Sequence, residues 1–272
     1  MTGRVETTHC GALARVTLHH PGKFNAMSRA MWCALQSTFE ALHQDTTVRC
    51  VVVRGTGGHF CAGGDIAEYP GFRFDVAQLQ QFHEREVWGG LQAILDCDVP
   101  VIAHIEGNCM GAGLEIASCC DLRVASRTAR FGAPIARLGF PMAPREAALV
   151  SHAVGAATAR AMLLAAQVFD AAHMQSQGFL FQTLGEDELV GQVESLAERI
   201  ANLAPQAARM NKQTLRALNR HLAPVEYAQA AIKNIADASV SISAAVSTYG
   251  YAASNEHREG IAAFLEKRPP IF

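Results

Sequence analysis

The chain has 272 residues, of which 50% are hydrophobic and 18% are charged, and its formal net charge is -2. This length and composition suffice for a full globular core, and the weak negative charge argues against a nucleic-acid-binding protein. The longest apolar stretch, residues 147–166, contains His152 and Arg160, so we expect no transmembrane helix and no membrane partner.

The cysteines indicate a reducing environment. The chain has eight cysteines and no CxxC pair, and several of them, Cys50, Cys61, Cys109, Cys119 and Cys120, lie in apolar stretches. We therefore expect all eight to be buried small hydrophobic residues, with neither a disulfide framework nor a zinc site. Because residues 1–9 also lack the apolar core of a signal peptide, we expect a cytoplasmic protein.

Hydrophobic patterning predicts an α/β first part and an all-helical second part. In chain order, the first part has a strand over 12–19, a helix from its N-cap Ser28 to Gln44, a strand over 49–54, a helical region over 72–96, a strand over 101–105, a helix over 113–121, strands over 122–126 and 130–132, a helix over 145–166, a strand over 167–169, a helix over 171–177 and a strand over 179–184. The second part has helices over 187–203, 205–218, 225–246 and 256–267.

No strand pattern remains after residue 186, and we place a domain boundary near residue 190. Residues 1–190 then form the α/β core, and residues 191–272 form a helical region with little core of its own. Such a region is expected to pack on the first part or on another subunit.

Two glycine turns follow buried strands and are the strongest chemical signal. One lies in residues 60–65, and the other contains Gly107, Gly111 and Gly113 before a helix. A turn that leads into a helix presents free N–H groups and the positive end of the helix dipole. The N–H groups of Gly64 and Ala112 could together form an oxyanion hole, provided that Ala112 has a negative φ.

Two glutamates are candidates for acid/base work. Glu115 lies in the first turn of the helix after the second glycine turn. It is either a solvated residue that the dipole favours or a buried base with a raised pKa. Glu146 follows a proline-containing loop, and we interpret it as a helix-start charge pair with Arg145 rather than as a catalytic residue.

Other site types have little support. The histidines show no metal-ligand spacing, and His19, His20, His59 and His104 are interpreted as strand-end or core residues. No dinucleotide, P-loop or serine-hydrolase motif is present, and Gly107, Gly111 and Gly113 have the wrong spacing for an NAD site.

Four segments resemble the crotonase (enoyl-CoA hydratase/isomerase) superfamily. They are residues 21–27, 60–66, 107–121 and 264–272, and the match spans essentially the whole chain in order. The resemblance implies a spiral of ββα units followed by a helical trimerisation region. It also implies a homotrimer or a dimer of trimers, an acyl-CoA thioester as substrate, and no permanently bound cofactor or metal.

The resemblance also assigns roles to residues. The N–H groups of Gly64 and Ala112 would hold the thioester oxygen as it becomes an enolate, although the family usually has glycine where Ala112 stands. Phe264 and Lys267, in the tail, would reach coenzyme A, often on the adjacent subunit. The other residues implied to surround coenzyme A are Lys23, Ala26, Ala62, Asp65 and Ile66.

The chain departs from the family in its acid/base residues. The hydratases it resembles use one glutamate at the position of Glu115 and a second where this chain has Ile135. Some other members place a carboxylate where it has Ala143. The loop over 140–146 lacks the usual glycine pair, which would bring Arg145 and Glu146 near the site.

We therefore expect one-base chemistry on a thioester enolate, with Glu115 as the base, helped by Glu146. Isomerisation or another enolate reaction, such as decarboxylation or thioester hydrolysis, fits better than water addition. The alternative is a catalytically impaired acyl-CoA-binding homologue. Candidates for lining the acyl pocket are Trp88, Phe140 and Met142.

Overall fold

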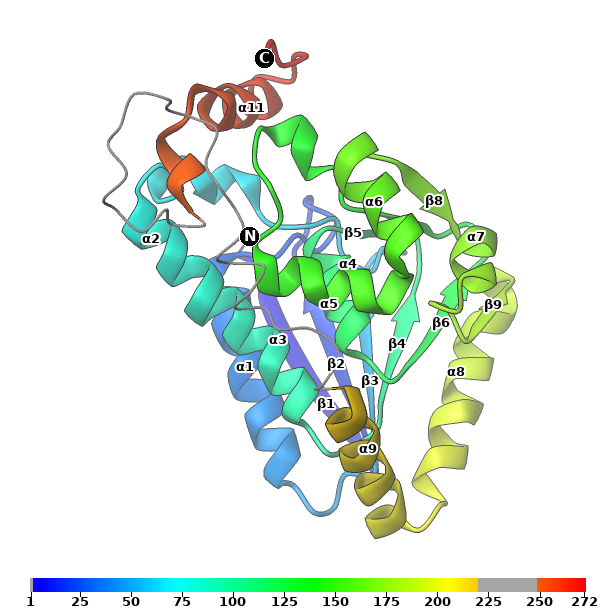
Figure 1. Cartoon of the computed structure of the whole chain (residues 1–272). Helices are drawn as coiled ribbons and strands as arrows, with labels where there is room; N and C mark the ends of the chain where they lie inside the picture. The colour runs from blue at the N-terminus through cyan, green and yellow to red at the C-terminus, as the bar shows by residue number, and fades with distance from the viewer. Residues whose placement is uncertain (1, 220–248) are drawn as a thin grey trace.

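A computed structural model describes residues 2–219 and 249–272, which form two sheets with helices around them (Figure 1). The main sheet has the order β1-β2-β3-β4-β6-β9, and a smaller sheet has the order β5-β7-β8. The strands of the main sheet are β1 (Arg4–Cys10), β2 (Leu13–His19), β3 (Cys50–Gly55), β4 (Val101–Ile105), β6 (Leu122–Ser126) and β9 (Gln182–Leu184). Those of the smaller sheet are β5 (Asn108–Met110), β7 (Arg130–Gly132) and β8 (Val168–Asp170). The α/β class is confirmed.

Helical segments connect the strands and complete the C-terminal part. Between the strands lie α1 (Arg29–Gln44), η1 (Ile66–Gly71), α2 (Val76–Gln81), the π-helical η2 (Phe82–Val87), α3 (Trp88–Asp96), α4 (Ala112–Cys119), η3 (Ile135–Leu138), α5 (Pro144–Val154), α6 (Ala156–Ala165) and α7 (Ala171–Ser176). The described C-terminal part contains α8 (Glu186–Ala201), α9 (Pro205–Asn219), η4 (Gly250–Ala253) and α11 (Asn255–Leu265). The helix expected over 225–246 lies outside the described residues.

Parallel pairing in the main sheet places the two predicted glycine turns at one edge of the sheet. Strands β2, β3, β4, β6 and β9 run parallel to one another, whereas the edge strand β1 is antiparallel to β2. Every residue of β4 is buried, as a strand covered on both faces requires. Since β3 leads into the first glycine turn and β4 into the second, both turns lie beyond the carboxyl ends of adjacent strands. That edge is where open α/β sheets generally bind ligands.

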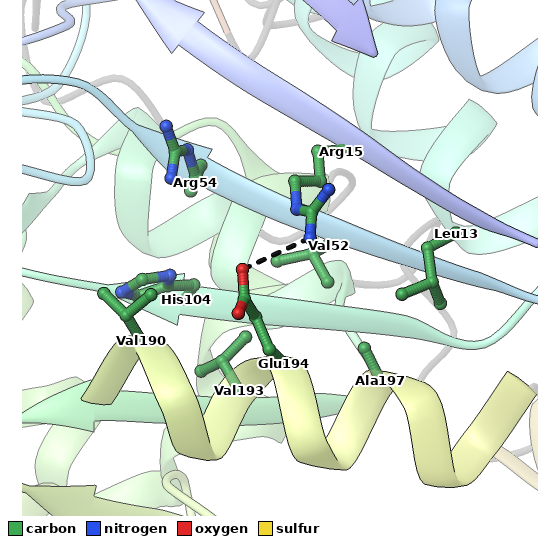
Figure 2. Close-up of a pocket in the computed structure, with 9 residues that line it drawn as sticks. All are labelled: Leu13, Arg15, Val52, Arg54, His104, Val190, Val193, Glu194 and Ala197. Atoms are coloured by element: carbon green, nitrogen blue, oxygen red, sulfur yellow. Dashed lines mark hydrogen bonds and ion pairs between the residues drawn. The ribbon is translucent and has the colours of Figure 1, made fainter. Parts of the chain in front are cut away.

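Helix α8 covers one face of the main sheet. Its residues Leu189, Val193 and Ala197 share a buried cluster with Val52 and Ile102 of the sheet. Figure 2 shows the α8 side chains facing β2, β3 and β4, with an ion pair between Arg15 and Glu194. The crevice between them holds about 20 Å³, room for about one water molecule. The predicted boundary near residue 190 falls within α8, and the division into domains stays a prediction.

The structure differs from the sequence expectations in local detail, and the short strand β5 within the second glycine turn is one such difference. Strand β1 was not predicted, because as an exposed edge strand paired only with β2 it lacks an apolar alternation. The single helix expected over 145–166 is two helices, since Gly155 has a φ of 82° and breaks the helical path. Cys10 and Cys33 are exposed, because they lie on that edge strand and on the outer face of α1.

The remaining sequence expectations concern caps and membranes. Ser28 caps α1 as predicted, with its side chain accepting a hydrogen bond from the Met31 N–H. Within the described residues, no helix combines the length and the apolar character that crossing a bilayer would need. The cytoplasmic location stays a prediction.

Candidate active site

A cavity of 720 Å³ lies at the edge of the sheet where the two glycine turns meet. Ten of the eleven residues predicted for the site line it: Lys23, Ala26, Ala62, Gly64, Asp65, Ile66, Ala112, Glu115, Phe264 and Lys267. Only Glu146 does not. The structure therefore brings together, in one chain, the segments that the sequence pointed to separately, including the C-terminal tail.

Gly64, in the first glycine turn, has a backbone N–H without a hydrogen-bond acceptor among residues 2–219 and 249–272. Gly63 and Asp65, on either side of it, bond to Met27 through Gly63 O and Asp65 N, each at 2.8 Å. In extended backbone, neighbouring amides point in opposite directions, so the Gly64 N–H points away from Met27. A Cβ at Gly64 would collide with the hydroxyl of Tyr69, and therefore only glycine fits here.

Ala112 presents the second amide. It is the first residue of α4, where N–H groups have no partner within the helix. Gly111, just before it, has a φ of 47°, and its own N–H bonds to Gly132 O at 2.8 Å. Ala112 itself does not have a positive φ. Its backbone therefore meets the requirement for a negative φ that its Cβ imposes.

Glu115 lies on the cavity wall one turn into α4 and is partly buried. The interpretation as a solvated helix-start residue is wrong. Burial raises the pKa of its carboxyl well above the usual range, and the nearby charge of Glu146 raises it further, while Arg73 opposes both effects. A carboxyl with such a raised pKa is suited to exchanging protons near neutral pH.

Glu146 is only 2% exposed, so its interpretation as a surface charge pair with Arg145 is also wrong. Arg145 instead pairs with Glu84 at 3.2 Å. Glu146 Oε1 lies 3.0 Å from Nδ1 of His83, and His83, not Glu146, lines the cavity. Burial raises the pKa of Glu146 to about 8. Since the two glutamates influence each other, their titrations belong to the pair.

Two polar residues of the cavity wall, His83 and Arg73, carry no recognisable motif in the sequence. His83 lies in the π-helical segment η2, a wide turn that often marks functional sites. Burial lowers the pKa of His83 well below its usual value, so the ring is neutral. Arg73 follows η1 and is fully buried.

The residues at the departures from the family pattern carry no exchangeable proton. Ile135 and Ala143 both line the cavity, and neither side chain can act as an acid or base. Phe140 and Met142 line it as expected. Trp88 does not: it lies at a separate surface hollow, and the guanidinium of Arg145 sits 5.5 Å from the centre of its ring.

The outer part of the cavity carries exposed cations. Lys23 pairs with Asp65 at 2.6 Å, and its side chain is well exposed. Phe264, in the last turn of α11, and Lys267, just after that helix, are exposed too. Lysine ammonium groups are suitable partners for phosphates, but binding of coenzyme A by these residues stays a prediction.

Comparisons with known proteins agree with this geometry. The family model for "Enoyl-CoA hydratase/isomerase" matches residues 8–272. The 2,3-dehydroadipyl-CoA hydratase of Escherichia coli is 30% identical over 94% of this chain and 93% of that protein. The crotonyl-CoA hydratase of Syntrophomonas wolfei is 28% identical over 96% and 94%.

A solved structure shows the same fold. The enoyl-CoA hydratase/carnithine racemase of Magnetospirillum magneticum superposes with a TM-score of 0.78 at 30% identity, covering 100% of this chain and 96% of that chain. The expected crotonase-like fold is confirmed.

Proposed function

The chain belongs to the enoyl-CoA hydratase/isomerase family, and from this premise we propose that it is an acyl-CoA enzyme that works through a thioester enolate. One observation carries the proposal: Gly64, Ala112 and Glu115 all line the same cavity. The substrate brings coenzyme A with it, and no other cofactor is needed.

The proposed reaction starts with proton removal. The thioester oxygen accepts hydrogen bonds from the Gly64 and Ala112 N–H groups, which stabilise the negative charge that it gains. Glu115 takes a proton from the carbon chain and returns it to another carbon of the resulting enolate. This sequence is an isomerisation of the double bond, and it needs only one base.

Water addition fits the cavity less well. Adding water across a double bond benefits from a second acid/base group, and Ile135 and Ala143 provide none. His83 does not replace them, because Nε2 lies 3.3 Å from Nη1 of Arg73 and Nδ1 lies 3.0 Å from Glu146. Both ring nitrogens are therefore occupied. Glu146 acts through His83 and Glu115 as a positioning residue.

The test of the proposed function is a panel of CoA thioesters given to the wild-type protein. We expect conversion of 3-enoyl-CoA into the conjugated 2-enoyl-CoA, followed by ultraviolet absorbance, to be faster than hydration of 2-enoyl-CoA. A structure with acetoacetyl-CoA should place the thioester oxygen within hydrogen-bonding distance of the Gly64 and Ala112 nitrogens. A thioester bound elsewhere would contradict the proposed site.

A second candidate is an acyl-CoA-binding protein without efficient catalysis. The apolar side chains of Ile135 and Ala143 on the cavity wall favour it. It predicts that CoA thioesters bind measurably but that none on the panel is converted, so the same assays separate the two candidates.

We also propose that the chain forms a homotrimer or a dimer of trimers. Helix α9 attaches to the core through polar side chains: Arg209 donates to Asp45 O, Lys212 pairs with Asp121, and Arg216 pairs with Asp98. Its large apolar side chains, Met210, Leu215 and Leu218, are exposed. A helix that turns its apolar residues outward is suited to an interface between subunits.

Light scattering of the purified protein is expected to give the mass of three or six chains. Replacing Leu215 and Leu218 together by serine should shift that mass towards one chain. A monomeric wild-type protein would contradict the proposed assembly.

A further inference from the structure

The most unusual group on the cavity wall is the guanidinium of Arg73. The side chain is 1% exposed and lies between two aromatic rings, with Cζ 4.4 Å from the ring centre of Tyr69 and 4.1 Å from that of Phe140. Arginine stays charged in proteins, and a buried cation is normally paired with an anion. Among the described residues, no carboxylate forms an ion pair with Arg73.

Two neutral histidines accept hydrogen bonds from two of the three guanidinium nitrogens. Nε donates to Nε2 of His257 and Nη1 donates to Nε2 of His83, both at 3.3 Å. The Nδ1 atoms face Ala252 O and Glu146 Oε1, each at 3.0 Å. Since arginine can only donate, both histidines accept at Nε2 and carry their proton on Nδ1. Burial lowers the pKa of His257 to about 4, so neither ring brings a compensating charge.

The third nitrogen of the guanidinium, Nη2, is buried and forms no hydrogen bond of good geometry within the described residues, and the only group there that interacts with the guanidinium as a possible acceptor besides the two histidines is the neutral Tyr251 hydroxyl. Oε2 of Glu146 is likewise buried without a hydrogen-bond partner among the described residues. The charge of Arg73 opposes the increase in the pKa values of Glu115 and Glu146, but among the described residues neither carboxyl forms an ion pair with the guanidinium. A buried donor that lacks a partner is unfavourable, and an anionic ligand would supply the missing acceptor.

The position of Arg73 indicates which part of a ligand would meet it. The other cations on the cavity wall, Lys23, Arg137 and Lys267, are exposed and suit the phosphates of coenzyme A. Arg73 is buried, and one tyrosine ring separates it from the oxyanion hole: the Tyr69 hydroxyl lies against Gly64, and the Tyr69 ring stacks on the guanidinium. Its partner would therefore be on the acyl group.

We propose that Arg73 binds a carboxylate on the acyl chain, so that the substrate is the CoA thioester of a short dicarboxylic acid. This inference rests on the proposed function, because it takes the cavity to hold an acyl-CoA. A guanidinium recognises a carboxylate through charge-assisted hydrogen bonds of fixed geometry.

The test uses equilibrium binding of saturated ligands, which needs no turnover. Succinyl-, glutaryl- and adipoyl-CoA are compared with butyryl-, valeryl- and hexanoyl-CoA by calorimetry on the wild-type protein. At one chain length or more, we expect the carboxylated ligand to bind at least about tenfold more tightly than its alkyl partner. Tighter binding of the alkyl ligand at every length would overturn the proposal.

Variants test whether Arg73 causes the tighter binding of the carboxylated ligands. Arg73→Met should abolish the preference while alkyl-CoA affinity changes little, and Arg73→Lys should keep part of it. The matched control is Arg137→Met, which removes an exposed arginine of the same cavity and should leave the ratio of the two affinities unchanged. If the preference for carboxylated ligands survives in Arg73→Met, or is lost in Arg137→Met, a group other than Arg73 binds the carboxylate.

The wild-type comparison remains decisive if Arg73→Met fails to fold. Failure of the proposed function is also distinguishable from failure of this inference. Binding of none of the six ligands would contradict the acyl-CoA site itself, whereas binding of the alkyl ligands alone would remove only the carboxylate site.

Discussion

Replacing Glu115 by glutamine is expected to lower kcat/KM by about 10²–10⁴-fold, the usual contribution of a positioned acid/base group. The amide has nearly the shape of the carboxyl but cannot take the substrate proton. Since Ile135 and Ala143 offer no substitute on the cavity wall, no second base should rescue the reaction. The measurement is steady-state turnover of the enoyl-CoA that the wild type converts fastest.

Glu194→Gln is the matched control for this experiment. Glu194 lies on α8, on the other face of the sheet, where it pairs with Arg15 (Figure 2). The same chemical change at that position should leave turnover unaltered. Equal rates for wild type and Glu115→Gln would remove Glu115 from the mechanism.

The pH profile gives a second readout of the same base. Glu115 must be ionised to accept a proton, so kcat/KM should rise with pH through an apparent pKa above the ordinary value of 4.5 for a glutamate. The Glu146 charge contributes to that increase in pKa. In Glu146→Gln the rising limb should therefore move to lower pH, and an unchanged limb would show that the two carboxyls are not coupled.

The meeting of Gly64 and Ala112 at one cavity could be predicted from the sequence because its determinants are local. Each glycine turn directly follows a buried strand, and strands β3 and β4 are parallel neighbours. Once the two strands pair, their carboxyl ends must lie at the same edge, and Gly64 and Ala112 are brought to one cavity. The position of Glu115 follows from that of Ala112, because both belong to the first turn of α4.

The polar wall around Arg73 could not be predicted in this way. Its partners, His83 and His257, come from η2 and α11, and no spacing along the chain relates them to Arg73. The same holds for Glu146, whose partner His83 is not its sequence neighbour Arg145. Whether a charged residue is solvated or buried here depends on which helices pack over it, and that is decided by tertiary contacts.

Replacing Ala112 by proline is expected to lower turnover by about 10²–10³-fold, the usual cost of removing one oxyanion-hole donor. Proline has no N–H, so the variant deletes the donor that side-chain substitutions leave in place. Ala112 is the first residue of α4, the helical position at which proline is best tolerated. The measurement is kcat on the same enoyl-CoA, together with thermal unfolding to verify the fold.

Ala156→Pro provides the matched control, since Ala156 is the first residue of α6 and does not line the cavity. It carries the same backbone change, so a general effect of proline on the fold would appear in both variants. A loss confined to Ala112→Pro would assign the effect to the missing N–H and to the ring that replaces it in the cavity. If Ala112→Pro folds and retains wild-type turnover, the Gly64 amide alone is sufficient, and the two-donor mechanism is wrong.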